Sequence, residues 1–108
     1  MSAHPDSIRA RLSADAPQAQ VVSALLVVAG AQAGLPVDRI DDAVMGADLL
    51  LGARRIPRTV GLTIHPGAVE LAVSDVDAAW LEGQRQMLEV LATAVIAEGA
   101  GVRLRVEP

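Results

Sequence analysis

"TVGLTIHPGAVELAVSD", residues 59–75, is the stretch that decides the fold. Apolar side chains alternate with small or polar ones on both sides of Pro66-Gly67, which is the pattern of two half-buried strands. A Pro-Gly pair suits the two central positions of a type II turn. The stretch therefore predicts a β-hairpin, and its inward-facing residues are expected to be Val60, Leu62, Ile64, Val69, Leu71 and Val73.

Periodic segments on both sides of the hairpin predict the remaining elements. Alternation predicts strands over residues 7–14 and 102–108, and apolar residues at helical spacing predict helices over residues 16–33, 37–53 and 78–98. Asp15 is expected to cap the first helix in a capping box with Gln18, and Asp77 to cap the third. The first helix is apolar beyond a single face, so we expect it to be well buried.

These elements predict one domain over residues 1–108 of the α+β class. The order is β-α-α-β-β-α-β, and a hydrophobic sheet face has to be covered by another layer. We therefore expect a two-layer sandwich in which a four-stranded mixed sheet carries three helices on one face.

Composition excludes several classes of protein. Hydrophobic residues make up 52% of the 108 residues, but Trp80 is the only aromatic one, so the core has to be aliphatic. The net charge of −4 argues against non-specific binding of nucleic acid, and the lack of cysteine excludes thiolate metal sites. The N-terminus has no signal-peptide pattern, and residues 21–31 are too short to span a membrane, so we expect a cytoplasmic protein with no membrane contact.

The predicted second helix has an unusual flank. In "DDAVMGADLLLGAR", residues 41–54, Asp48 and Gly52 lie one turn apart beside the apolar stripe. The simplest interpretation is a half-exposed flank with a glycine for close packing, and Asp75, at the end of the hairpin, is then an ordinary strand end.

The element order and these residues resemble the GHKL (Bergerat-type) ATPase fold, and most closely the anti-sigma-factor serine kinases. "LPVDRIDDAVMGADLLLGAR" resembles their second helix, "VELAVSDVDAAW" the end of their hairpin, and "GQRQMLEVLATAV" and "GVRLRVEP" their last helix and strand. The resemblance implies that Asp48 stands where the family has its catalytic glutamate. It also implies that Asp75 stands where the family's aspartate reads the adenine amino group.

The motifs depart from the family pattern in ways that weaken a nucleotide site. Gly52 stands where the family has its magnesium-binding asparagine and offers no ligand atom, although Mg²⁺ requires near-ideal oxygen coordination. Asp77 and Ala79 replace two glycines that let the backbone approach the nucleotide. The lid has no room between Asp75 and Trp80. We therefore expect no ATP, magnesium or other cofactor, no catalytic residues and no metal site. Neither His4 nor His65 has a companion for metal binding or catalysis.

The resemblance implies a regulatory function, and three hypotheses remain. The first is a pseudo-ATPase module that acts by protein contact, with a sigma factor or its antagonist as partner. The second is a divergent ATP-dependent serine kinase, and the third is a small structural domain. We also expect the sheet face opposite the helices to be open, with Arg9, Arg11, Arg103 and Arg105 as a basic stripe if the terminal strands adjoin, and to support a homodimer or a heterodimer with a related regulator.

Overall fold

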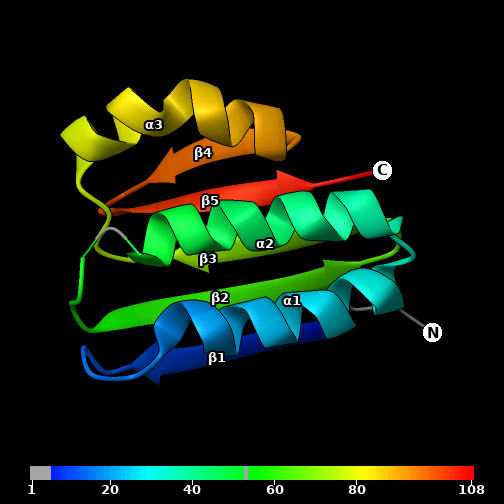
Figure 1. Cartoon of the computed structure of the whole chain (residues 1–108), viewed down its shortest axis with the longest axis horizontal. Coiled ribbons are helices and arrows are strands. Elements are labelled where there is room, and N and C mark those ends of the chain that lie inside the picture. Colours follow the sequence, from blue (N-terminus) through cyan, green and yellow to red (C-terminus); the bar gives the residue numbers. More distant parts are fainter. Residues whose placement is uncertain (1–5, 53) are drawn as a thin grey trace.

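The computed structural model describes residues 6–52 and 54–108, and in these ranges it contains five strands and three helices (Figure 1). The predicted helix end at Ala53 and the residue His4 lie outside the described residues. In chain order the elements are β1 (Asp6–Leu12), α1 (Gln18–Ala33), α2 (Val37–Gly52), β2 (Arg58–His65), β3 (Ala68–Val73), α3 (Ala78–Leu91), β4 (Ala94–Glu98) and β5 (Gly101–Val106).

The sheet confirms the α+β class but differs from the predicted sheet. The strand order is β1-β2-β3-β5-β4, and every neighbouring pair is antiparallel. The prediction of a four-stranded mixed sheet is therefore wrong in strand number and in direction. The β2–β3 hairpin is confirmed, and Gly67 has the positive φ of 77° that the third position of a type II turn requires.

The extra strand comes from the end of the predicted third helix. α3 stops at Leu91, and Ala92 is already extended. From there the Thr93 N–H donates to the carbonyl of Arg105, and β4 pairs with β5 through a two-residue turn that begins at Gly99, with a φ of 53°. Gly99 is therefore the first turn residue of a hairpin, a position that favours glycine.

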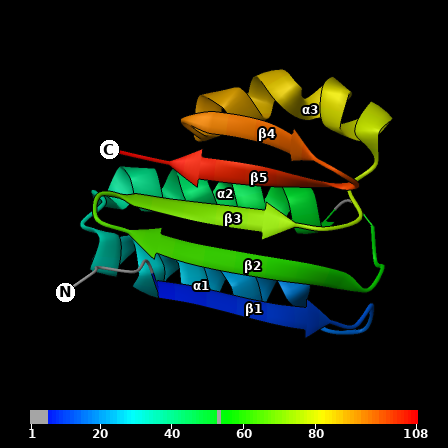
Figure 2. The same cartoon turned by 180° about the vertical axis from the view of Figure 1, so that it is seen from behind.

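All three helices lie on one side of the sheet. Figure 1 shows α1 and α2 across the sheet, with α3 beside β4, and in Figure 2 no helix of the described chain crosses the opposite face. The inward residues predicted for the hairpin are all buried except Ile64, which is half-buried against the core. In the part of the chain that the structure describes, no helix is long and apolar enough to cross a membrane.

The first helix is not buried as predicted. α1 buries Gln18, Val22, Leu26, Ala29, Gly30 and Ala33. Val21, Val27 and Val28 are instead exposed, with exposed fractions of 39, 52 and 57%. The predicted capping box also does not form, because the cap is Pro17 and the Gln18 side chain donates to the carbonyls of Ser13 and Ile56. Apolar residues lie all round this helix, so its sequence does not specify which face packs against the sheet.

Candidate functional site

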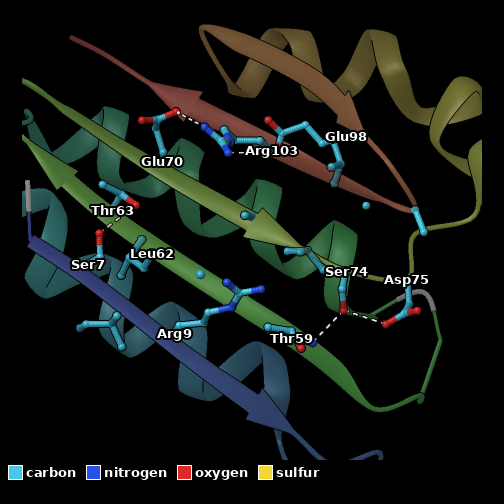
Figure 3. A pocket seen from close by; sticks show the side chains of 17 residues that line it. Ser7, Arg9, Thr59, Leu62, Thr63, Glu70, Ser74, Asp75, Glu98 and Arg103 are labelled. Carbon is cyan, nitrogen blue, oxygen red and sulfur yellow. Dashed lines mark hydrogen bonds and ion pairs between the residues drawn. The ribbon is translucent and has the colours of Figure 1, made fainter.

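A hollow of about 500 Å³ lies on the sheet face that the helices leave uncovered (Figure 3). Its floor is formed where Gly61 on β2 pairs with Ala72 on β3, because neither residue has a side chain beyond a methyl group. The same row of the sheet places Arg9 of β1 beside Gly61 and Arg103 of β5 beside Ala72. Two long cationic side chains thus border a floor of small residues.

Hydroxyl groups line the hollow on the β1–β2 side and at its end. The hydroxyls of Ser7 and Thr63 lie 3.4 Å apart, and Figure 3 shows them near one end of β1. At the other end the Thr59 N–H donates to Ser74 Oγ over 2.7 Å, and this hydroxyl donates in turn to Asp75 Oδ2 over 2.7 Å. The lining therefore offers hydrogen-bond acceptors and donors over a shallow apolar floor.

Asp75 is held in place through its backbone. It has a φ of 57°, a left-handed conformation that Asp tolerates better than most residues. The Nη1 atom of Arg58 donates to the carbonyls of Ser74 and Asp75, over 3.3 and 3.2 Å. Arg58 itself is 2% exposed, and burial lowers the pKa of its guanidinium from the ordinary value. A buried cation therefore fixes the end of β3 from beneath.

Glu70 is the centre of the charges on this face. Its carboxylate lies 3.5 Å from Arg103 and 3.3 Å from Arg105, and it also contacts the Nε2 atom of His65. Arg103 contacts Glu98 as well, at 3.0 Å. His65 thus has a carboxylate companion, contrary to the expectation from the sequence.

The predicted basic stripe does not form. β1 and β5 are separated by β2 and β3, so Arg9 and Arg11 lie apart from Arg103 and Arg105. The latter two are neutralised by glutamates, whereas within the described residues Arg9 has no ion pair. Arg11 has no ion pair within the described residues either and donates to Thr59 Oγ1, so the open face has two unneutralised cations on β1 and an ion-pair cluster across the hollow.

The two residues expected at a nucleotide site lie apart. Asp75 lines the hollow, but Asp48 lies on the helix layer, where Ser23 of α1 donates to its Oδ1 over 3.1 Å. Gly52 is exposed at the end of α2, and a methyl group there would meet nothing within 4 Å. The close packing considered for Gly52 is instead found at Gly30, where a Cβ would lie 2.6 Å from Ile40.

The N-terminus of α3 is already capped by the chain itself. Asp77 Oδ2 accepts the Trp80 N–H over 2.9 Å, as the sequence predicted. A carboxylate therefore occupies the end of the helix where an anionic ligand would be stabilised.

The described residues do not gather a metal site: no group of three His, Asp or Glu side chains in residues 6–52 and 54–108 could hold an ion. A comparison with models of known protein families finds no match, and a comparison with curated proteins finds none.

Proposed function

We propose that the protein is a regulatory module that acts by binding another protein through the uncovered face of its sheet. The observation that carries this proposal is the hollow over Gly61 and Ala72, bordered by Arg9 and by the Arg103–Glu70 pair. A floor of small residues admits an inserted side chain, while charges and hydroxyls around it give orientation and specificity.

The module is a pseudo-ATPase that resembles an anti-sigma factor. Three features argue against a working nucleotide site: Gly52 lacks a ligand atom, Asp48 is engaged by Ser23, and Asp77 caps α3. The partner that fits this proposal is a sigma factor or its antagonist, bound without a cofactor.

Calorimetric titration with Mg-ATP separates this function from the kinase hypothesis. We expect no heat of binding at protein concentrations near 100 µM, which would detect a micromolar ligand. Micromolar binding of Mg-ATP would contradict the pseudo-ATPase and favour a divergent serine kinase.

The binding face is tested by filling the hollow. The immobilised chain is presented with the purified sigma factor and antagonist encoded nearest to its gene. We expect capture by the wild type and loss of capture by Ala72→Arg, which places a long side chain over the floor. Gln86→Arg, which introduces the same side chain at an exposed position on α3, is the control and should leave capture unchanged. Equal capture by both variants would exclude the sheet face, and capture of neither protein by the wild type would leave the structural-domain hypothesis.

A further inference from the structure

The outer face of α1 is unlike the rest of the protein surface. The sixteen residues of α1 include no charged side chain, although half of the helix faces solvent. A helix that is apolar all round is normally buried on all sides. Figure 1 shows α1 at the edge of the helix layer, with α2 on one side of it and no helix of the described chain beyond it. The outer face of α1 therefore lacks a cover within the described chain.

The exposed apolar residues on this face have the spacing of a helix–helix contact. Val21, Ala24, Val28 and Ala31 are separated by three, four and three residues, and we call them the α1 seam. At 100° per residue they fall within roughly 80° of one another around the helix. All four are exposed, Val28 by 57%. This is the a/d pattern by which two helices pack side by side.

The α1 seam is complementary to the α1 seam of a second copy that runs in the opposite direction. If a second copy lies antiparallel, with the two-fold axis at the level of Leu26, Val21 faces Ala31 of the other copy and Ala24 faces Val28. Each layer then joins one valine to one alanine, so the two helices keep an even separation. A parallel pair would alternate Val–Val with Ala–Ala layers and could not pack evenly.

The polar ends of the seam fit the same arrangement. Gln20 and Gln32 are exposed at the two ends, at equal distances along the chain from Leu26. In the antiparallel pair, Gln20 of one copy lies level with Gln32 of the other, on the opposite flank of the seam, so uncharged polar side chains border both ends of the apolar contact. A two-fold contact requires this reciprocity, in which residue i meets j and j meets i.

We propose that the protein forms an antiparallel homodimer through the α1 seam. The contact uses the helix layer, so it leaves the hollow of each copy free on the outer sheet face, and the proposed partner binding does not depend on it (Figures 1 and 2). A sixteen-residue helix is about 24 Å long, and such a contact is smaller than the roughly 1,200–2,000 Å² of a standard interface. We therefore expect a dissociation constant in the micromolar range.

Sedimentation equilibrium from about 10 µM to 1 mM tests the dimer. We expect a reversible monomer–dimer equilibrium, weakened at least about tenfold by Val28→Glu, because a carboxylate would be desolvated in the seam. Val90→Glu is the matched control: Val90 is also an exposed valine, at 74%, but lies on α3. A monomer across the whole range, or equal weakening by both variants, would overturn the proposal. Ala72→Arg should leave self-association unchanged, so that failure of the dimer and failure of the sheet-face proposal are distinguishable.

Cross-linking tests the antiparallel arrangement, and the lack of native cysteine makes it direct. We expect a short bismaleimide to join Gln20→Cys to Gln32→Cys when the two full-length variants are mixed. Each variant alone should stay uncross-linked, since in the antiparallel pair two copies of residue 20 lie about 18 Å apart. Cross-linking of each variant with itself, and not of the mixture, would show a parallel dimer and contradict the arrangement.

Discussion

Arg58 occupies a position where the pattern of its strand calls for an apolar residue. It precedes Val60 and Leu62 at the same inward spacing, and it is buried to 2% exposure. Its Nη1 atom bonds two carbonyls, while its Nε atom is buried without a hydrogen-bond partner in the described structure. The guanidinium thus donates to the carbonyls at the end of β3. Its burial disfavours the charged form, and this lowers its pKa.

Removal of this side chain should destabilise the fold. We expect Arg58→Ala to lower the free energy of unfolding by about 1–3 kcal/mol, because the carbonyls of Ser74 and Asp75 lose their donor in a buried site. Urea denaturation measures the change. Arg55→Ala, at an exposed position three residues earlier, should shift stability by less than about 0.5 kcal/mol. Equal losses in both variants would mean that Arg58 acts by charge and not by its buried contacts.

Among the elements, the strands were easier to predict than the helices. The alternation of residues 60–64 and 69–73 specified both the hairpin and its buried face, because a one-residue slip would have exposed every apolar side chain. The sequence of α1 did not specify which of its faces is buried, because valines and alanines lie all round the helix. The end of α3 was missed because Leu91, Val95 and Ala94 continue a helical spacing. The signal against it was the β-branched group Thr93, Val95 and Ile96 before Gly99.

The candidate site was only partly predictable for a related reason. Asp75 was identified because it ends a strand whose pattern is clear, and the structure places it at the hollow. The hollow itself depends on Gly61 lying beside Ala72, which is a matter of register between strands. The position of Arg9 across from Arg103 depends on the strand order, which alternation does not specify.

Two glycines in different elements should respond oppositely to alanine. At Gly101 in β5 a Cβ would lie 2.4 Å from the backbone carbonyl oxygen of Val73, so Gly101→Ala should cost about 1–3 kcal/mol of unfolding free energy. At Gly83 in α3 a Cβ meets nothing within 4 Å, so Gly83→Ala should raise stability by up to about 1 kcal/mol through helix propensity. Melting temperatures of the two variants measure both effects. A stabilised Gly101→Ala would show that β5 does not approach β3 this closely.

At the scale of the whole molecule, the helices and the sheet share one core. A single cluster of buried side chains includes residues of α1, α2, α3 and of strands β2, β3 and β5, and Trp80 packs against it. No element therefore has a separate core of its own within the described chain, and such a domain usually unfolds in one step.

Unfolding should accordingly be cooperative. We expect urea curves from Trp80 fluorescence, which reports on the start of α3, to coincide with curves from far-ultraviolet circular dichroism, which reports on every element. Measurement at about 0.1 µM, well below a micromolar dissociation constant, keeps the protein monomeric. An earlier fluorescence transition would show that α3 detaches before the sheet opens.

The place of β1 at the edge of the sheet has a consequence for the order of events during synthesis. β1 pairs only with β2 in the described sheet, and the partners Leu12 and Arg58 are far apart along the chain. A ribosome adds the 45 intervening residues in roughly 2–9 s. During that interval β1 has no partner, while α1 and α2 can already pack together with their apolar undersides uncovered. The nascent chain is thus accessible to chaperones and prone to aggregation until the β2–β3 hairpin leaves the exit tunnel. The hairpin then pairs with β1 and covers the apolar undersides of α1 and α2.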